Sequence, residues 1–238
     1  MRALGEIDGQ QRVSDVTAAI ARPRTRAGFV RWPLMILGLI GLGTFGLLTL
    51  YAAGHVYMPF DVSVERWIQG VSWGPFVTVF YWFDWLEGTR QYVAGIGVIV
   101  VVSALNWKNA PLMLLAAAST AVYTVTELAI QRPRPTADLV RVLRHTGSYS
   151  YPSGHMVFFS WAVLLLVICL LFGRAPRFLL AAAWVVAALV LLAAAIGRIY
   201  LGEHWPSDVI AGLALGTGWT ALVLSIRPLS NPALARSK

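Results

Sequence analysis

The stretch SGHMVFFSWAVLLLVICLLF, residues 153–172, decides the fold class, because its twenty residues contain no Asp, Glu, Lys or Arg. A membrane-spanning helix needs about 20 predominantly apolar residues. We therefore expect an all-α, polytopic membrane protein with six transmembrane helices in one bundle. The other five stretches of this character are 32–53, 91–105, 110–130, 178–197 and 206–226.

The overall composition agrees with a membrane chain and argues against several other classes. Hydrophobic residues make up 58% of the 238 residues and charged residues only 13%, against about 25% charged residues in a typical soluble domain. So few charges cannot cover the surface of a soluble domain. This argues against a soluble globular protein, a disordered chain and a nucleic-acid-binding module. The single cysteine, Cys169, excludes an internal disulfide and a metal site built from several cysteines.

The basic residues predict the domain layout and the orientation of the spans. Residues 1–31 are polar and arginine-rich, so we expect a cytoplasmic tail there. One membrane domain should follow over 32–226, and then a short cytoplasmic tail over 227–238. With the N-terminus inside, twelve Lys and Arg residues fall on the inner side and seven on the outer side. This bias agrees with the positive-inside rule.

The segment 56–89 is expected on the outer side as an interfacial, aromatic-rich helical segment. Val62, Trp67, Ile68 and Val71 are predicted to share one face of a short helix in this segment. Aromatic residues favour the headgroup level of the membrane. The aromatic residues that come after this short helix in the segment are Trp73, Phe76, Phe80, Tyr81, Trp82, Phe83 and Trp85.

Three polar clusters interrupt the apolar sequence, at residues 132–135 (RPRP), 151–155 (YPSGH) and 198–208 (RIYLGEHWPSD). Counting the spans places all three on the same side of the membrane, so we expect them to meet. Arg134 and Arg198 offer forked donors that suit a phosphate group.

The remaining polar residues of the clusters suit acid–base and phosphate chemistry. His155 and His204 can exchange protons or attack phosphorus near neutral pH. Ser153 and Gly154 stand where a span begins, where free N–H groups bind anions, glycine permits close approach and a serine caps the helix. Asp208 follows His204 by four residues and could fix the tautomer of its imidazole.

The three blocks together resemble the type 2 phosphatidic acid phosphatase family. The family pattern is a lysine, six residues and Arg-Pro; then Pro-Ser-Gly-His; then Ser-Arg, five residues, His, three residues and Asp. The motif region covers residues 127–208, and the six-span layout extends the resemblance over most of the chain. The matching residues are Arg134-Pro135, Pro152-Ser153-Gly154-His155, Arg198, His204 and Asp208.

The resemblance implies a hydrolase of lipid phosphates that uses no metal and no other cofactor. In this scheme His204 attacks phosphorus and forms a phosphohistidine, Asp208 orients His204, and His155 protonates the leaving oxygen. The implied phosphate-binding residues are Arg134, Arg198, Ser153 and Gly154.

Two positions depart from the family pattern. Glu127 stands in place of the lysine, and Gly197 replaces the serine before Arg198. A glutamate facing the phosphate would repel it, so three interpretations stay open. Glu127 pairs with Arg132, Arg134 or Arg198; it contacts a cationic or hydroxyl-bearing part of the substrate; or it marks a weakened or repurposed site. Arg132 is a candidate substitute for the lysine.

The resemblance leads us to expect an enzyme of the outer leaflet of a bacterial inner (plasma) membrane. Its expected substrates are a polyprenyl diphosphate, as for an undecaprenyl-diphosphatase, or phospholipid phosphates. The expected partners are this lipid and the membrane, without nucleic acid, and the sequence leaves the oligomeric state open. Two alternatives remain on the same scaffold: a lipid phosphoryl or headgroup transferase, and a non-catalytic lipid-binding relative, which Glu127 would favour.

Overall fold

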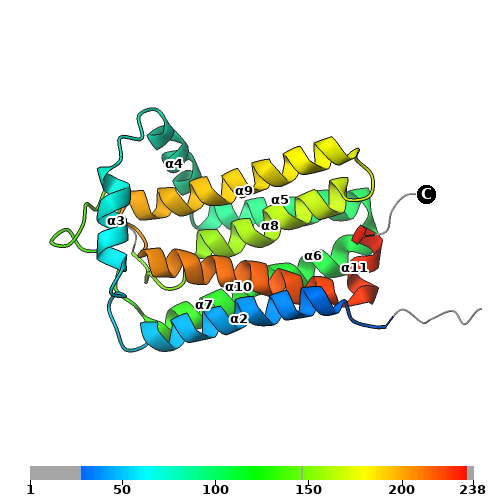
Figure 1. Cartoon of the computed structure of the whole chain (residues 1–238), viewed down its shortest axis with the longest axis horizontal. Helices are drawn as coiled ribbons and strands as arrows, with labels where there is room; N and C mark the ends of the chain where they lie inside the picture. The colour runs from blue at the N-terminus through cyan, green and yellow to red at the C-terminus, as the bar shows by residue number, and fades with distance from the viewer. Residues whose placement is uncertain (1–27, 146, 235–238) are drawn as a thin grey trace, which may run out of the picture.

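The computed structural model describes residues 28–145 and 147–234, and within them the chain is helical, with a single isolated β-bridge and no sheet. The long helices lie side by side in one bundle (Figure 1), as the sequence predicts. They are α2 (Trp32–Ala52), α5 (Thr89–Leu105), α6 (Ala110–Ala117) followed by α7 (Ser119–Ile130), α8 (Gly154–Leu171), α9 (Arg177–Tyr200) and α10 (Pro206–Ser225).

Five of the six predicted spans are long and apolar enough to cross a membrane, with Trp107–Ile130 counted as one. The exception is the span predicted at 91–105, because α5 has only 17 residues. It reaches the length of a span only together with α4 (Phe76–Trp85), from which it is bent by 84°. The six-helix count therefore holds when this bent pair is taken as one span.

The short helix α3 (Asp61–Gly70) corrects one prediction. Trp67 is 70% exposed whereas Ile68 is buried, so the apolar residues do not share a face. The buried face of α3 instead contains Asp61, Glu65, Ile68 and Gln69. The reason is that α3 packs across α9 and α10, where the neighbouring groups are polar, so its polar side chains point inward.

The aromatic-rich segment folds as the predicted helix, α4. Phe80 is buried, with its ring centroid 5.4 Å from that of Tyr200 on α9. Trp82 and Trp85 are 75% and 59% exposed, and the Arg90 guanidinium lies 4.9 Å from the Trp85 ring centroid. One side of α4 is thus fixed to the bundle, while its other side presents aromatic rings outward.

Small residues allow α10 to approach its neighbours closely. A Cβ added at Gly216 would lie 2.8 Å from the Val157 carbonyl oxygen of α8. A Cβ added at Gly41 of α2 would lie 2.7 Å from the Cα of Gly218. Glycines at helix crossings of this kind are typical of membrane bundles, and here they hold α10 between α2 and α8.

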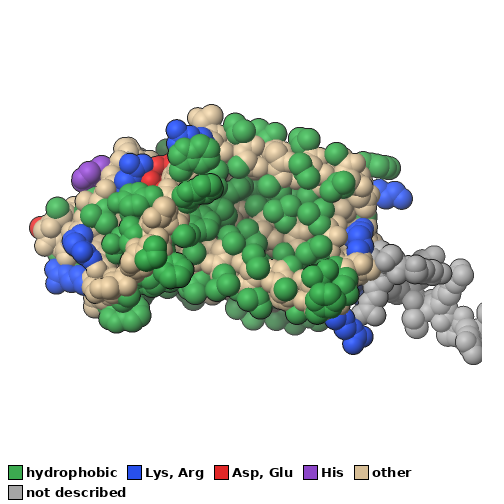
Figure 2. Space-filling view, turned by 90° about the horizontal axis from the view of Figure 1, so that it is seen from above, with side chains coloured by type: hydrophobic (Ala, Val, Ile, Leu, Met, Phe, Trp, Pro, Cys, Tyr) green, Lys and Arg blue, Asp and Glu red, His purple; other side chains and the backbone are tan. Residues whose placement is uncertain are grey.

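A short helix packs at one end of the bundle, and charged side chains lie at both ends. Residues 227–234 of the predicted tail form α11 (Arg227–Leu234), which packs on α6 and α8 at one end. Arg31 donates to Asn231 there at 2.8 Å. The space-filling view shows hydrophobic side chains along the flank and charged ones at the two ends (Figure 2). The rest of the two predicted tails, residues 1–27 and 235–238, lies outside the described residues.

Candidate active site

The three polar clusters meet at the end of the bundle opposite α11 (Figure 1), which confirms that they share one side. They surround a pocket of about 130 Å³. Five of the residues predicted from the sequence line this pocket: Arg134, Gly154, His155, Arg198 and His204. Its other lining residues are Glu87, Gly88, Gln91, Tyr92, Tyr123 and Ser148.

His204 lies buried in the turn between α9 and α10, with its Nδ1 2.7 Å from the carbonyl oxygen of Ser150. A carbonyl oxygen only accepts hydrogen bonds, so Nδ1 carries the proton and Nε2 keeps its lone pair. Burial, together with the charges of Arg134 and Arg198, holds the pKa of His204 well below its usual value of 6.5. The site therefore favours a neutral imidazole with a free Nε2.

Asp208 does not make the hydrogen bond expected of it. Its Oδ2 lies 3.9 Å from the Nδ1 of His204, which is too far for a hydrogen bond. This Oδ2 instead accepts the N–H of Trp205 at 2.9 Å and so caps α10, while Oδ1 accepts Nη1 of Arg132 at 2.5 Å. Asp208 does not bind His204 because Trp205 and Arg132 already hold its carboxylate. The carbonyl of Ser150 accepts the Nδ1 proton of His204 in its place.

His155 stands in the first turn of α8 and is 4% exposed. Its ring stacks on Phe159, with the centroids 6.4 Å apart. Its Nε2 is buried and has no hydrogen-bond partner in the described part of the chain. A buried polar atom is rarely left without a partner, so this nitrogen, in a residue that lines the pocket, is available to a ligand.

Ser153 and Gly154 occupy the predicted start of α8, but they contribute differently. Ser153 stands at the N-cap position, yet its side chain makes no capping bond, and its buried Oγ has no partner among the described residues. The capping prediction is thus wrong, because the Ser153 hydroxyl accepts no N–H of the first turn of α8. Gly154 lines the pocket, and a Cβ there would lie 2.9 Å from the ring of Tyr123. Glycine therefore makes room for this ring.

Arg134 is held in place by three hydrogen bonds. Its Nε and Nη2 donate to the carbonyl oxygen and the Oγ of Ser148 at 2.9 and 2.8 Å. Its Nη1 donates to the carbonyl oxygen of Glu203 at 2.6 Å. Burial lowers the pKa of Arg134, and the nearby Glu87 and Asp208 oppose this. Arg134 therefore brings a fixed cation to the pocket wall.

Arg198, 1% exposed, is held by carboxylates. Its Nη1 donates to Asp84 at 2.9 Å, and its Nη2 pairs with Glu203. Its Nε has no partner among the described residues. The two carboxylates occupy the terminal nitrogens of Arg198. Its Nε is therefore the donor that remains for a ligand in the pocket.

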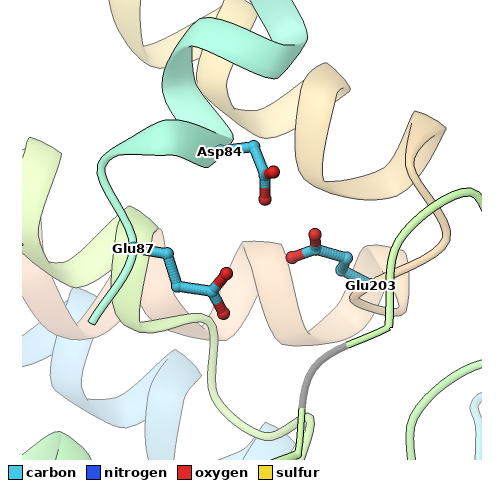
Figure 3. Close-up of side chains that lie close together, drawn as sticks. All are labelled: Asp84, Glu87 and Glu203. Carbon is cyan, nitrogen blue, oxygen red and sulfur yellow. The ribbon is translucent and has the colours of Figure 1, made fainter.

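A cluster of three carboxylates accompanies Arg198, formed by Asp84, Glu87 and Glu203, which point toward one another in Figure 3. Their nearest oxygens lie within 4.8 Å of one another, so this donor set has the spacing to hold a metal ion. Two arginines already balance two of its three charges, since Arg198 binds Asp84 and Glu203 and Arg144 binds Asp84 at 2.8 Å. We therefore interpret the cluster as the support of Arg198.

The two predicted modulators take other positions. Arg132 does not line the pocket and cannot substitute for the family lysine, because Asp61 and Asp208 bind its buried guanidinium. Glu127 makes no ion pair with an arginine in the described residues. Its charge instead acts on Tyr123, one turn earlier on α7, and on Arg134 without an ion pair. The pairing interpretation of Glu127 is therefore wrong at contact distance.

Several residues of the site have no signal in the sequence pattern. The Ser150 carbonyl that binds His204 is a main-chain group. Gln91, whose Nε2 donates to the carbonyl oxygen of Gly154 at 3.2 Å, belongs to an apolar stretch. Tyr123 also belongs to an apolar stretch, and Glu87 lies in the segment expected at the interface. For Gln91 and Glu87, the only indication in the sequence is that each is a polar residue near the end of a span.

Comparison with protein families identifies one match, described as the PAP2 superfamily, over residues 108–232. Two curated relatives are similar to part of the chain. An undecaprenyl-diphosphatase of Sulfolobus acidocaldarius is 33% identical over 78 residues, which cover 33% of this chain and 34% of that protein. A lipid A 1-phosphatase of Rhizobium etli is 36% identical over 83 residues, which cover 34% of this chain and 31% of that protein. The chain thus matches about a third of each curated relative.

Two solved structures have a similar fold. A PAP2-type phosphatidylglycerolphosphate phosphatase of Bacillus subtilis superposes with a TM-score of 0.61 and 22% identity, covering 78% of this chain and 94% of that one. The LpxE structure of Aquifex aeolicus superposes with a TM-score of 0.53 and 21% identity, covering 70% of this chain and 96% of that one. At such identities the likeness establishes the arrangement of helices.

Proposed function

The chain belongs to the PAP2 superfamily, and on this premise we propose that it is a membrane enzyme that hydrolyses lipid phosphates through a phosphohistidine on His204. The observation that carries the proposal is the setting of His204. Its Nδ1 is bound to the Ser150 carbonyl, which leaves Nε2 free in a residue that lines a pocket with Arg134, Arg198 and His155.

In the first step, Nε2 of His204 attacks phosphorus, and the bond from phosphorus to the leaving oxygen breaks. His155 gives that oxygen a proton, so that the lipid leaves as a neutral alcohol or as a monophosphate. Arg134 and the free Nε of Arg198 supply donors to the phosphoryl oxygens. Fixed donors directed at developing charge are the largest catalytic contribution in many enzymes.

In the second step, a water molecule attacks the phosphohistidine. His155 accepts a proton from this water, the bond from phosphorus to Nε2 breaks, and inorganic phosphate leaves. His204 then returns to its neutral form with Nδ1 still bound to Ser150. In this scheme His204, His155, Arg134 and Arg198 supply the groups that both steps require.

The size of the pocket supports a phosphate headgroup as the part that enters it. A volume of about 130 Å³ is well below the roughly 300 Å³ at which pockets for drug-sized ligands begin. The apolar tail would remain among the helices and lipid chains outside. We propose a polyprenyl diphosphate or a phospholipid phosphate at the outer leaflet. One curated relative is named an undecaprenyl-diphosphatase and the other a lipid A 1-phosphatase, so both names describe removal of phosphate from a membrane lipid.

The proposal is tested by measuring phosphate release by the full chain in detergent with EDTA present. Undecaprenyl diphosphate, phosphatidic acid and phosphatidylglycerol phosphate are offered in turn. We expect release from at least one lipid. A sample stopped during turnover of ³²P-labelled lipid should hold label that acid removes and alkali does not, as a phosphohistidine requires.

Two variants make this test specific. His204→Ala should lose both the release and the label. His145→Ala, a matched change of an exposed histidine in the loop before α8, should keep both. Release that disappears with EDTA, or a label that persists in His204→Ala, would overturn the proposed mechanism. Release that depends on an added alcohol would indicate a transferase.

A further inference from the structure

We infer that Asp61 and Arg132, which belong to neither histidine motif, are positioning residues that hold the nucleophile His204 in its reactive orientation. The inference rests on the proposed function, since it assigns a role in the reaction of His204. Neither side chain lines the pocket, so both act through other groups.

The side chains of Asp61, Arg132 and Asp208 form a buried clamp. Arg132 donates Nη1 to Asp208 at 2.5 Å and Nη2 to Asp61 at 3.1 Å, and its Nε donates to the Val56 carbonyl at 2.9 Å. All three charged side chains of this clamp are 0% exposed. Asp61 also accepts the N–H of Ser207 at 2.8 Å and its hydroxyl at 2.7 Å. The clamp thus fixes the first turn of α10 against α3.

The main chain of Arg132 is also linked to His204, through Ser150. The carbonyl oxygen of Arg132 accepts the N–H of Ser150 at 2.9 Å, and the carbonyl oxygen of Ser150 accepts Nδ1 of His204 at 2.7 Å. The neighbouring Pro133 carbonyl accepts the Ser150 hydroxyl at 3.0 Å and the indole N–H of Trp205 at 3.2 Å. A shift of Arg132 would therefore move the group that fixes the tautomer of His204.

Energetics favour a role beyond stability for this clamp. Taking charged groups out of water costs several kcal/mol per ion, so well-packed apolar residues often stabilise a core as well as a buried ion pair does. What charged partners add is a fixed geometry, because the fork of Arg132 has set directions toward both carboxylates. Misplacing a reacting group by about 1 Å can cost on the order of 100-fold in rate.

The test compares three variants of the full chain in detergent. The double variant Asp61→Asn/Arg132→Met removes one negative and one positive charge, so the core keeps its net charge without the clamp. Arg132→Lys keeps the charge but not the fork, and serves if the double variant does not fold. Glu65→Gln is the matched control, a change of one buried carboxyl to an amide one turn later on α3. Melting temperature, kcat and KM are measured, with the rate of label transfer to His204.

We expect the double variant to melt near the wild-type temperature but to lose about 10- to 100-fold in kcat and in label transfer, with KM changed little. Arg132→Lys should lose less, and Glu65→Gln nothing. A folded double variant with wild-type kcat would show that the clamp is only structural and would overturn the inference. A wild-type enzyme that neither releases phosphate nor takes up label would instead overturn the proposed function itself.

Discussion

Glu127 is one of the two positions at which the chain departs from the family pattern. The structure removes one interpretation, because Glu127 makes no ion pair with an arginine among the described residues. Its charge still acts on Arg134, which lines the pocket. A negative charge near the pocket opposes the binding of an anionic headgroup. Water and salt screen part of this repulsion.

Removing this charge should therefore tighten binding. We predict that Glu127→Gln lowers KM for a lipid diphosphate about 2- to 5-fold at low salt, an effect typical of a partly screened charge. The effect should shrink as the salt concentration rises, while kcat stays within about twofold. Leu128→Gln, an exposed change one residue further, is the control. A higher KM in Glu127→Gln would indicate instead that Glu127 contacts a cationic or hydroxyl-bearing part of the substrate.

Glu65 is a second residue with an unusual charge state. Both of its carboxylate oxygens are buried without a partner among the described residues, and burial, with the charges of Asp61 and Asp208, raises its pKa to about 9. The folded protein therefore keeps this proton between pH 4.5 and about 9, whereas the unfolded chain releases it. Stability contributed by the proton is present at low pH and is lost as the pH rises.

Glu65→Gln should remove this loss. We predict that the wild type loses stability relative to Glu65→Gln by at most about 1.4 kcal/mol per pH unit across that window. The check is a series of melting temperatures in detergent from pH 5 to pH 9, both proteins in the same buffers. Parallel curves for the two proteins would mean that Glu65 is ionised in the folded state.

The sequence could predict the site residues that belong to side-chain motifs, but not those that act through main-chain or long-range contacts. His155, His204, Arg134 and Arg198 belong to side-chain motifs with fixed spacing, and all four line one pocket. The Ser150 contact uses a main-chain carbonyl, which every residue possesses. The contact of Arg132 with Asp61 joins positions 71 residues apart. No local pattern records such a contact, so both had to come from the fold.

At the scale of the element, the spans were predictable and the short helices were not. Apolar length identifies a span, since crossing a membrane needs about 20 predominantly apolar residues. The face of α3 cannot be predicted in that way, because its neighbours are the polar ends of α9 and α10 and not lipid. This explains why Trp67 points outward while Glu65 is buried. The bend of 84° between α4 and α5 lies at a break that contains Gly88, whose φ is +59°.

The close crossing of α2 and α10 gives a prediction at this scale. Gly41→Ala places a Cβ 2.7 Å from the Cα of Gly218, and a main-chain atom cannot rotate away. We expect a destabilisation of about 1–3 kcal/mol, as for other overpacked cores, measured as a lower melting temperature in detergent. Gly43→Ala, on the same helix with no atom within 4 Å, is the matched control and should melt like the wild type. Equal melting of both variants would contradict this crossing.

For the whole molecule, the open question is which side of the membrane the pocket faces. The positive-inside rule counts Lys and Arg residues in the short loops near the ends of the spans. The structure strengthens the bias, because Arg132 and Arg198 at the pocket end are buried and paired with carboxylates. These two are among the seven basic residues that are predicted to lie outside, whereas Lys108, Arg174 and Arg177 at the opposite end are exposed.

We therefore predict that the pocket faces outward. The native cysteine, Cys169, is buried, so a single introduced cysteine can report the side. His145→Cys, in an exposed loop at the pocket end, should react with a membrane-impermeant maleimide on intact cells. Lys108→Cys, exposed at the other end, should react only after the cells are opened. The reverse pattern would place the pocket in the cytoplasm. The chemistry of His204 would be unchanged, but the substrate would then have to come from the inner leaflet.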